Sequence, residues 1–430
     1  MPKMMDRSCD PLEIDKLTGL YTREAFLKYA DEKIKNNPGV RFNIVISDFV
    51  NFKHFNERYG TEAGDLLLKR TGEMLQLIDP DIIAGRYSAD RFVTLMRHIG
   101  VESVQFLEDF RLPPQAALEL PTTSITVKFG ICDDVDHDKP VSVSCDHAYI
   151  ALQSVKHNYK KNVGVYNEDL GRSVMEELII EENMKNALDE RQFVVYYQPK
   201  MDVETNKICG AEALVRWIHP ELGFMNPGTF IPIFEKNGFI TEMDLYVWKE
   251  VCRSLDEWKI AGLDPVPVSS NVSRIDFDTP DLAEKITAIV DSYGLDHSLF
   301  HIELTESACS DNSAAIFSII SKLHDAGFVI ELDDFGAGYT SLSSLSELEY
   351  DILKFDMSLL KKDKPSSDKT VLTVAMQLAQ MMNLKVIQEG VETAEQLERL
   401  KSLGCVIVQG FYYSKPLPKD EFVEFMKNHR

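Results

Sequence analysis

The sequence predicts an α/β protein of two domains, in which an open sheet covered by helices precedes a (β/α)8 barrel of the TIM type. The chain has 430 residues, of which 44% are hydrophobic, so it can build two substantial cores. Helix-like and strand-like patterns alternate in the first 170 residues, which is typical of a sheet covered by helices. Eight strand-like segments then recur over about 240 residues, which matches the size and rhythm of a (β/α)8 barrel.

The first domain opens on an amphipathic helix, REAFLKYADEKIK, which leads to a short apolar strand, FNIVISDF. The later segments repeat these two patterns. The expected elements are a helix at 23–35, a strand at 42–49, a helix at 63–78, strands at 82–85 and 93–96, a strand at 124–131 and a helix at 147–161.

A helix rich in Glu, Leu and Met, at 169–191, connects the two domains, and we place the boundary between residues 170 and 171. Short apolar strands then recur, most of them separated by helical stretches such as 282–294 and 371–383. This rhythm predicts the barrel. The eight expected strands are 193–199, 208–217, 266–273, 299–306, 328–336, 351–358, 385–392 and 406–413.

Charge and composition argue against several classes of protein. A net charge of −23 disfavours binding to a nucleic acid polymer or to an anionic membrane. No apolar run approaches the ~20 residues that span a bilayer, and the N-terminus lacks an apolar signal core, so we expect a cytoplasmic protein. Seven scattered cysteines without a CxxC pair indicate reduced thiols rather than disulfides or a zinc site. A phosphate ligand would need a local device, such as bound metal ions, to overcome the repulsion.

Polar residues stand at or near the ends of the expected barrel strands, and the C-terminal ends of such strands meet on one face. Clustered carboxylates repel one another unless cations compensate them. Oxygen ligands without histidine or thiolate suit Mg²⁺ or Mn²⁺, and an adjacent acid pair suggests a carboxylate shared by two ions, as in phosphoryl displacement. Taken singly, each acid could instead be a solvated strand end. The residues concerned are Glu212, Asn271, Glu303, Asp333, Asp334, Lys354, Glu389 and Gln409.

Seven motifs in the second half occur in a fixed order, each at a strand end. Together they resemble the EAL-domain family of cyclic di-GMP phosphodiesterases over roughly residues 175–430. The resemblance implies an enzyme that uses two Mg²⁺ or Mn²⁺ ions to open one ester bond of cyclic di-GMP, giving linear pGpG. It also implies a homodimer formed through this domain. The motifs are AEALVRW, SSNVS, ELTES, DDFGAGYTS, LKFD, QEGVE and QGFYYSKPL.

The resemblance also implies a role for each site residue. Glu389 corresponds to the general base for the attacking water, and Lys354 helps to orient that water. Glu306 resembles the glutamate that holds the loop after DDFG in its metal-binding shape, and Gln409 completes the polar floor. The implied metal ligands are Glu212, Asn271, Glu303 and Asp333 for the first ion, and Asp333 and Asp334 for the second.

Two further residues concern the substrate. Gln198, in YYQP, resembles the guanine-contacting glutamine, and Arg216 resembles the arginine at the phosphate, where its planar fork can engage two oxygens. Either could instead have a structural role. The departures from the family pattern are mild: Gln388 precedes Glu389 where alanine is common, and YQPK replaces YQPI. None removes a metal ligand or the base.

The first half resembles the GGDEF-domain family of diguanylate cyclases, whose sheet domain is like that of nucleotide cyclases. The resemblance rests on DKLTGLYTREAF, ISDFVNFKHFNERYG and AGD. The signature position is occupied by RYSADRF, a predicted hairpin in which Ser88 and Ala89 replace two glycines and Arg91 replaces the second acid. Glycines there permit positive φ and the close approach of a nucleotide, which a Cβ obstructs. We therefore expect a degenerate domain without cyclase activity.

Binding without turnover stays open for this domain. In one interpretation GTP binds and regulates the second domain. In the other, the matching residues are structural remnants and the domain supports dimerisation. The residues are Asp48 and Asp90 for a metal ion, Asn56 and Asp65 for guanine, and Lys156 and Lys160 for the phosphates.

The main alternative to an enzyme is a receptor that binds cyclic di-GMP without hydrolysis and signals through its conformation. Lost metal ligands or a lost base would mark such a receptor, and this sequence has lost neither.

Overall fold

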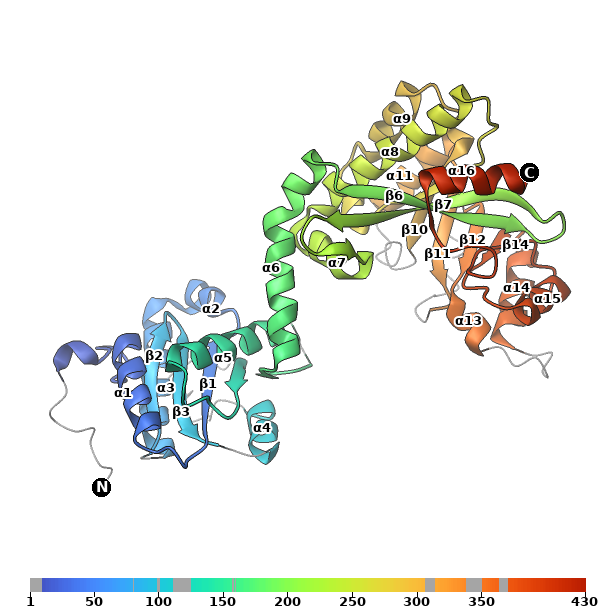
Figure 1. The fold of residues 1–430 in the computed structure, drawn as a ribbon. Helices are drawn as coiled ribbons and strands as arrows, with labels where there is room; N and C mark the ends of the chain where they lie inside the picture. The colour runs from blue at the N-terminus through green and yellow to red at the C-terminus, as the bar shows by residue number, and fades with distance from the viewer. Residues whose placement is uncertain are drawn as a thin grey trace. The chain divides into compact units, whose positions relative to one another are not determined.

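The computed structural model describes residues 10–79, 81–98, 101–110, 125–156, 158, 160–305, 314–337, 350–362 and 370–430, with the backbone alone for 101–103 and 362. The chain divides into two compact units, Met1–Leu178 and Ile179–Arg430. Helix α6 (Glu168–Asp189) spans the division, and the predicted boundary at residues 170 and 171 lies within it. Figure 1 shows the elements of both units.

The first unit is a five-stranded sheet in the order β2-β3-β1-β4-β5. The central strand β1 is antiparallel to β3 and β4, and β5 runs parallel to β4. The strands are β1 (Phe42–Phe49), β2 (Ile83–Ser88), β3 (Arg91–Arg97), β4 (Val127–Cys132) and β5 (Val163–Val165). The helices are the 3-10 turn η1 (Pro11–Glu13), α1 (Arg23–Lys35), α2 (Phe52–Tyr59), α3 (Thr61–Ile78), α4 (Val101–Glu108) and α5 (Val141–Val155).

Helix α5 differs from the predicted helix at 147–161. It starts directly after Pro140 and ends at Val155. The fixed φ of proline favours a helix start, and the apolar spacing used for the prediction did not include this signal. Lys156 is consequently the C-cap residue of α5, and Lys160 lies beyond the helix in an exposed position.

The second unit confirms the predicted eight-stranded barrel. The pairing closes in the ring β6-β7-β9-β10-β11-β12-β13-β14, with β14 returning to β6. The strands are β6 (Phe193–Asp202), β7 (Lys207–His219), β9 (Val268–Asn271), β10 (Phe300–Thr305), β11 (Ile330–Phe335), β12 (Ile352–Phe355), β13 (Lys385–Gln388) and β14 (Ile407–Val408), with β8 (Gly223–Met225) and β15 (Leu417–Pro418) at the rim.

One strand departs from the all-parallel arrangement of a (β/α)8 barrel. Strand β6 is antiparallel to both of its neighbours, β7 and β14. Only residues 203–206 separate β6 from β7, which is too short for a crossover helix, so the two strands form a hairpin. The other barrel strands pair in parallel.

Helices cover the barrel and bury a continuous apolar core against its strands (Figure 1). Trp217 packs in that core against Phe230, with ring centroids 5.7 Å apart. No helix in the described ranges has the length and apolar character needed to cross a membrane. The helices are α7 (Pro227–Asn237), α8 (Ile240–Ile260), α9 (Leu282–Ser292), α11 (Ala314–Asp325), α13 (Met357–Lys362), α14 (Val371–Met381), α15 (Ala394–Ser402) and α16 (Lys419–Asn428), with 3-10 turns η2 (Arg274–Asp278) and η3 (His297–Leu299).

Candidate active site

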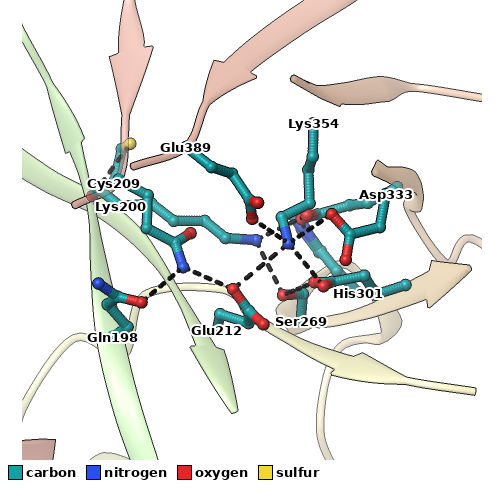
Figure 2. Close-up of polar contacts among 12 residues, drawn as sticks. Gln198, Lys200, Cys209, Glu212, Ser269, His301, Asp333, Lys354 and Glu389 are labelled. Carbon is teal, nitrogen blue, oxygen red and sulfur yellow. Dashed lines mark hydrogen bonds and ion pairs between the residues drawn. The ribbon is translucent and has the colours of Figure 1, made fainter. Parts of the chain in front are cut away.

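A buried lysine lies at the centre of four acids of the barrel. Lys354, on β12, is fully buried, and Figure 2 shows its side chain pointing among Asp333, Glu212 and Glu389. Its Nζ lies 2.6 Å from a carboxylate oxygen of Glu303, 2.7 Å from Glu389, 3.1 Å from Asp333 and 3.3 Å from Glu212. The site therefore holds one ammonium for four carboxylates that come from different segments of the chain.

Strand register brings these side chains together. Glu212 on β7 stands opposite Gln198 on β6, and Glu303 on β10 stands opposite Asn271 on β9. Alternate residues of a barrel strand point inward, so acids at matching register meet inside the ring. The antiparallel direction of β6 does not disturb this, because its register still places Gln198 at the level of Glu212.

Two backbone features aim the acids at the ends of β11 and β13. Asp334 has φ of 60°, in the left-handed region, and the pairing of β11 with β12 shifts register at this point. Such a bulge re-aims neighbouring side chains, and aspartate tolerates this conformation better than most residues. Glu389 is followed by Gly390 with φ of 67°, where a Cβ would lie 2.4 Å from Cβ of Met357. Glycine is therefore required for the turn after Glu389.

Burial and mutual repulsion favour the neutral form of three of the acids. Burial, together with the charge of Glu303, raises the pKa of Glu212 to about 7 against the attraction of Lys354. Burial likewise raises the pKa of Asp333 to about 8 and that of Glu389 to about 7, again against Lys354. Burial alone would also raise the pKa of Glu303, but Lys354 and Lys200 together outweigh it and lower that pKa. Added cations would thus displace protons held at this site near neutral pH.

Two amides form the floor beside Glu212. Gln409 donates from Nε2 to Oε2 of Glu212 at 2.5 Å and to Oε1 of Gln198 at 3.1 Å. Gln198 in turn donates to the main-chain oxygen of Ser414 at 3.3 Å. The structure therefore brings Gln409 and Gln198 to the acids. Both the oxygen and the nitrogen of the Gln198 amide already form hydrogen bonds within the protein.

A cavity of about 480 Å³ borders the ends of β7 and β9, and both Arg216 and Asn271 line it. The guanidinium of Arg216 lies 5.7 Å from the ring centroid of Tyr196, and burial lowers its pKa. The main-chain oxygen of Asn271 accepts a hydrogen bond from Nε1 of Trp248 at 3.1 Å. The cavity thus places a cation and an amide within reach of one ligand. The predicted Glu306 lies outside the described residues.

The residues fit divalent cations by charge and by donor type. Across the described ranges, no group of three acidic, histidine or cysteine side chains is arranged to hold a metal ion. The barrel acids contact the ammonium of Lys354 instead. The ligand atoms at the site are oxygens, which suit Mg²⁺ or Mn²⁺. Four carboxylates face one ammonium, so once the three acids with raised pKa lose their protons, their negative charge is available for such ions to neutralise.

Comparison with known families agrees with this geometry. The model of the EAL domain matches residues 181–416, more than half of the chain. The chain belongs to the EAL domain family. A second model, described as diguanylate cyclase, GGDEF domain, matches residues 12–162, so the EAL domain follows a GGDEF domain in tandem.

Curated relatives match nearly the whole of this chain within longer chains of their own. Cyclic di-GMP phosphodiesterase NbdA of Pseudomonas aeruginosa is 30% identical over 427 residues, which cover 97% of this chain and 54% of NbdA. Cyclic di-GMP phosphodiesterase PdeR of Escherichia coli is 29% identical over 422 residues, which cover 96% of this chain and 63% of PdeR. The chain thus spans between about half and two thirds of these relatives.

A solved structure of the PaMucR phosphodiesterase in complex with c-di-GMP resembles the EAL domain. It is 34% identical with a TM-score of 0.54, and the match covers 56% of this chain and 99% of that chain.

In the GGDEF domain, acidic and basic side chains lie together at the positions where the family resemblance implies a metal ion. Asp48 is buried on β1, and its Oδ2 lies 3.3 Å from Nζ of Lys156 and 3.7 Å from Nε of Arg91. Burial and the charge of Asp48 raise the pKa of Asp90 to about 6. Lys156 and Arg91 already balance the charges of Asp48 and Asp90, so a divalent metal ion does not fit the charge of this site.

The hairpin predicted at RYSADRF is confirmed, and its turn is strained. Ser88 pairs with Arg91 across the turn, and Ala89 has φ of 40°. Nε of Arg86 donates to the main-chain oxygen of Ala89 at 2.9 Å, which holds this conformation. A non-glycine residue at positive φ costs free energy, and its Cβ fills space that glycine would leave open.

The guanine positions of the GGDEF domain are only partly in place. Asn56 packs against Gly64, where a Cβ would lie 1.9 Å from its Oδ1, and that oxygen has no hydrogen-bond partner among the described residues. Asp65, on α3, is exposed. The structure therefore brings Asp48, Asp90 and Lys156 into one cluster and does not tie Asp65 to it.

Proposed function

We propose that the EAL domain is a divalent-metal-dependent phosphodiesterase that hydrolyses cyclic di-GMP to linear pGpG. The observation that carries this proposal is the set of four carboxylates around Lys354 inside the barrel. The cavity lined by Arg216 and Asn271 supports a substrate that carries phosphate. The names of NbdA and PdeR and the ligand in the PaMucR structure support the same substrate.

The barrel acids would hold two Mg²⁺ or Mn²⁺ ions. Such ions, when bound, neutralise charge on phosphate oxygens and make water more acidic. The proposed ligands are Glu212, Asn271, Glu303, Asp333 and Asp334.

Glu389 is the proposed general base. Its pKa of about 7 suits a group that must accept a proton at neutral pH and later release it. Nζ of Lys354, 2.7 Å from Oε1, holds the carboxylate and orients the water. The proton of the water passes to Glu389 while its oxygen attacks phosphorus, and the bond from phosphorus to the 3′ oxygen breaks. The leaving 3′ oxygen takes up a proton from solvent, so one phosphodiester is opened with a 5′-phosphate and a 3′-hydroxyl as its new ends, and Glu389 later returns its proton to solvent.

Arg216 and Gln198 are proposed to bind the substrate. Arg216 would engage phosphate oxygens from the cavity wall. Gln198 would have to exchange its present contact with Ser414 for guanine, since both ends of its amide are engaged.

The GGDEF domain is proposed to regulate rather than to cyclise. Ala89 and Arg91 support this, because the first fills the turn and the second pairs with Asp48. GTP binding in this domain and a homodimer through the EAL domain stay predictions. A titration of GTP against the hydrolysis rate tests the regulatory role, and a flat response without GTP binding would contradict it.

The direct test incubates the full chain with Mg²⁺ and cyclic di-GMP and follows pGpG by chromatography. Wild-type protein is expected to form pGpG, and Glu389→Gln is expected to lose roughly 10²–10⁴-fold in kcat with substrate binding kept. Tight binding without product from the wild type would mean a receptor instead of an enzyme. Cyclic di-GMP made from GTP would contradict the assignment of the GGDEF domain.

A further inference from the structure

A second buried ion pair lies inside the barrel, one layer from the acids. Lys200 stands two residues after Gln198 on β6, and Glu331 stands two residues before Asp333 on β11, so both point inward. Nζ of Lys200 lies 2.6 Å from Oε2 of Glu331, and their side chains are 4% and 0% exposed. His301 on β10 contacts the other oxygen of Glu331 at 2.7 Å.

This pair is linked to a proposed metal ligand through one hydroxyl. Nζ of Lys200 donates to Oγ of Ser269 at 2.8 Å, and Oγ of Ser269 lies 2.5 Å from Oε2 of Glu303. Figure 2 shows Lys200 and Ser269 beside the acids. An ammonium can only donate, so the single proton of Ser269 must point to Glu303. The direction of the chain from Lys200 to Glu303 is therefore fixed.

Both oxygens of Glu303 are thereby held. Oε1 accepts from Lys354 at 2.6 Å, and Oε2 accepts from Ser269. Glu303 is fully buried, so water does not compete for these bonds. With one donor on each oxygen, the plane of the carboxylate is set before any cation arrives.

We propose that Lys200 and Ser269 are positioning residues that hold Glu303 in the orientation in which it takes a divalent cation. Glu331 and His301 anchor Lys200 for this purpose. The inference rests on the proposed function in that it takes Glu303 to be a metal ligand. Partners that orient a metal ligand are typically worth 10–100-fold in metal affinity or activity.

A purely structural role predicts something different. A buried ion pair can often be exchanged for apolar residues of similar volume with little loss of stability. If Lys200 and Glu331 only filled the barrel, an apolar pair would serve as well, and metal binding would not change. The hydrogen bonds from Lys200 to Ser269 and from Ser269 to Glu303 are what an apolar pair cannot supply.

The test compares two adjacent serines. Ser269 and Ser270 are both fully buried on β9, but Oγ of Ser270 has no hydrogen-bond partner among the described residues. Mn²⁺ affinity of the full chain is measured by calorimetry without substrate. Ser269→Ala is expected to weaken it about 10–100-fold, and Ser270→Ala to leave it unchanged. Equal effects, or an unchanged affinity in Ser269→Ala, would overturn the proposal.

A second variant shows whether Lys200 acts through Ser269. The double substitution K200M/E331M removes both charges of the pair at once, so neither Lys200 nor Glu331 is left as an unpaired buried ion. It is expected to weaken Mn²⁺ binding as Ser269→Ala does, and adding Ser269→Ala to it is expected to cost nothing more. Fully additive losses would refute the coupling. If Ser269→Ala fails to fold, the Mn²⁺ affinity of K200M/E331M alone tests the proposal: an affinity equal to that of the wild type would overturn it.

The metal measurement separates this inference from the proposed function. If the wild type binds Mn²⁺ but forms no pGpG, the proposed function fails while the effect of Ser269→Ala on affinity still decides the inference. If the wild type hydrolyses cyclic di-GMP and Ser269→Ala binds Mn²⁺ normally, only the inference fails. Absence of saturable Mn²⁺ binding to the wild type overturns the inference outright.

Discussion

The EAL and GGDEF domains each place a buried acid beside a basic side chain, but with different ratios of acids to cations. In the EAL domain four carboxylates share the ammonium of Lys354. In the GGDEF domain the buried carboxylate of Asp48 lies within 4 Å of two cations, Lys156 and Arg91, and Asp90 is its acidic neighbour, so two acids face two cations. The first site has room for added positive charge, and the second has already been neutralised by the chain.

This difference shows that acids at the expected positions do not by themselves make a metal site. Asp48 and Asp90 both occupy positions that match metal ligands, and Asp48 is as buried as Glu212. What separates the domains is the number of cations that the chain itself supplies. A substitution that changes that number in either domain should therefore change how many divalent ions the protein binds.

The largest effect is expected from Lys354→Met, which leaves four carboxylates without their cation. Removing one partner of a buried ion pair typically costs about 3–5 kcal/mol. The EAL domain of this variant is expected to lose stability of that order in EDTA and to regain much of it with Mg²⁺. Differential scanning calorimetry with and without Mg²⁺ measures both changes, and hydrolysis of cyclic di-GMP should be lost.

The control for that prediction is Lys361→Met, which removes an exposed lysine on α13. It is expected to melt like the wild type under both conditions. If Lys354→Met were as stable as the wild type in EDTA, the acids would not depend on this ammonium.

Much of the EAL site could be predicted from the sequence, because its acids lie at the ends of strands whose order fixes where they meet. Glu212, Glu303 and Asp333 are examples, since pairing in register brings each into the barrel. The hairpin at RYSADRF could also be predicted from two short apolar runs around a turn.

The remaining features depend on distances across the barrel that spacing along the chain does not give. Lys200 and Glu331 are 131 residues apart in sequence, and no local pattern says that a lysine on β6 will meet an acid on β11. The lysine in YQPK was visible as a departure from the family pattern, but its partner was not. The antiparallel direction of β6 depends on a different feature, the link at 203–206, which is too short for a crossover helix and which the apolar pattern of the strands does not reveal.

A smaller effect, in the opposite domain, is expected from Arg91→Glu. The change replaces a cation near Asp48 with an acid, so the GGDEF domain is expected to bind one more Mn²⁺ per chain than the wild type. Calorimetric stoichiometry measures this. The matched control is Arg97→Glu on the same strand, which makes the same change of charge at an exposed position and should add no ion. An unchanged stoichiometry in Arg91→Glu would mean that charge ratio does not govern this site.

The smallest effect concerns the pH dependence of the GGDEF domain. Asp90 has a folded-state pKa of about 6, above the usual 3.8, because of burial and of Asp48. An acid with a raised pKa binds its proton more tightly in the folded state, so its contribution to stability is full below pH 3.8 and is lost as the pH rises through about 6. Asp90→Asn stays neutral and should avoid this loss. Its melting temperature is expected to rise relative to the wild type by up to a few degrees between pH 4 and pH 7, a window of about three units.

The control for Asp90 is Asp65→Asn, which alters an exposed carboxyl on α3 and should give a constant difference from the wild type. If Asp90→Asn also gave a constant difference, burial and the charge of Asp48 together would not raise the pKa of Asp90 in the folded domain. Lys156 and Arg91 would then offset both effects, since they are the cations beside Asp48. The two outcomes therefore measure how completely the chain has taken over the task that a metal ion would perform.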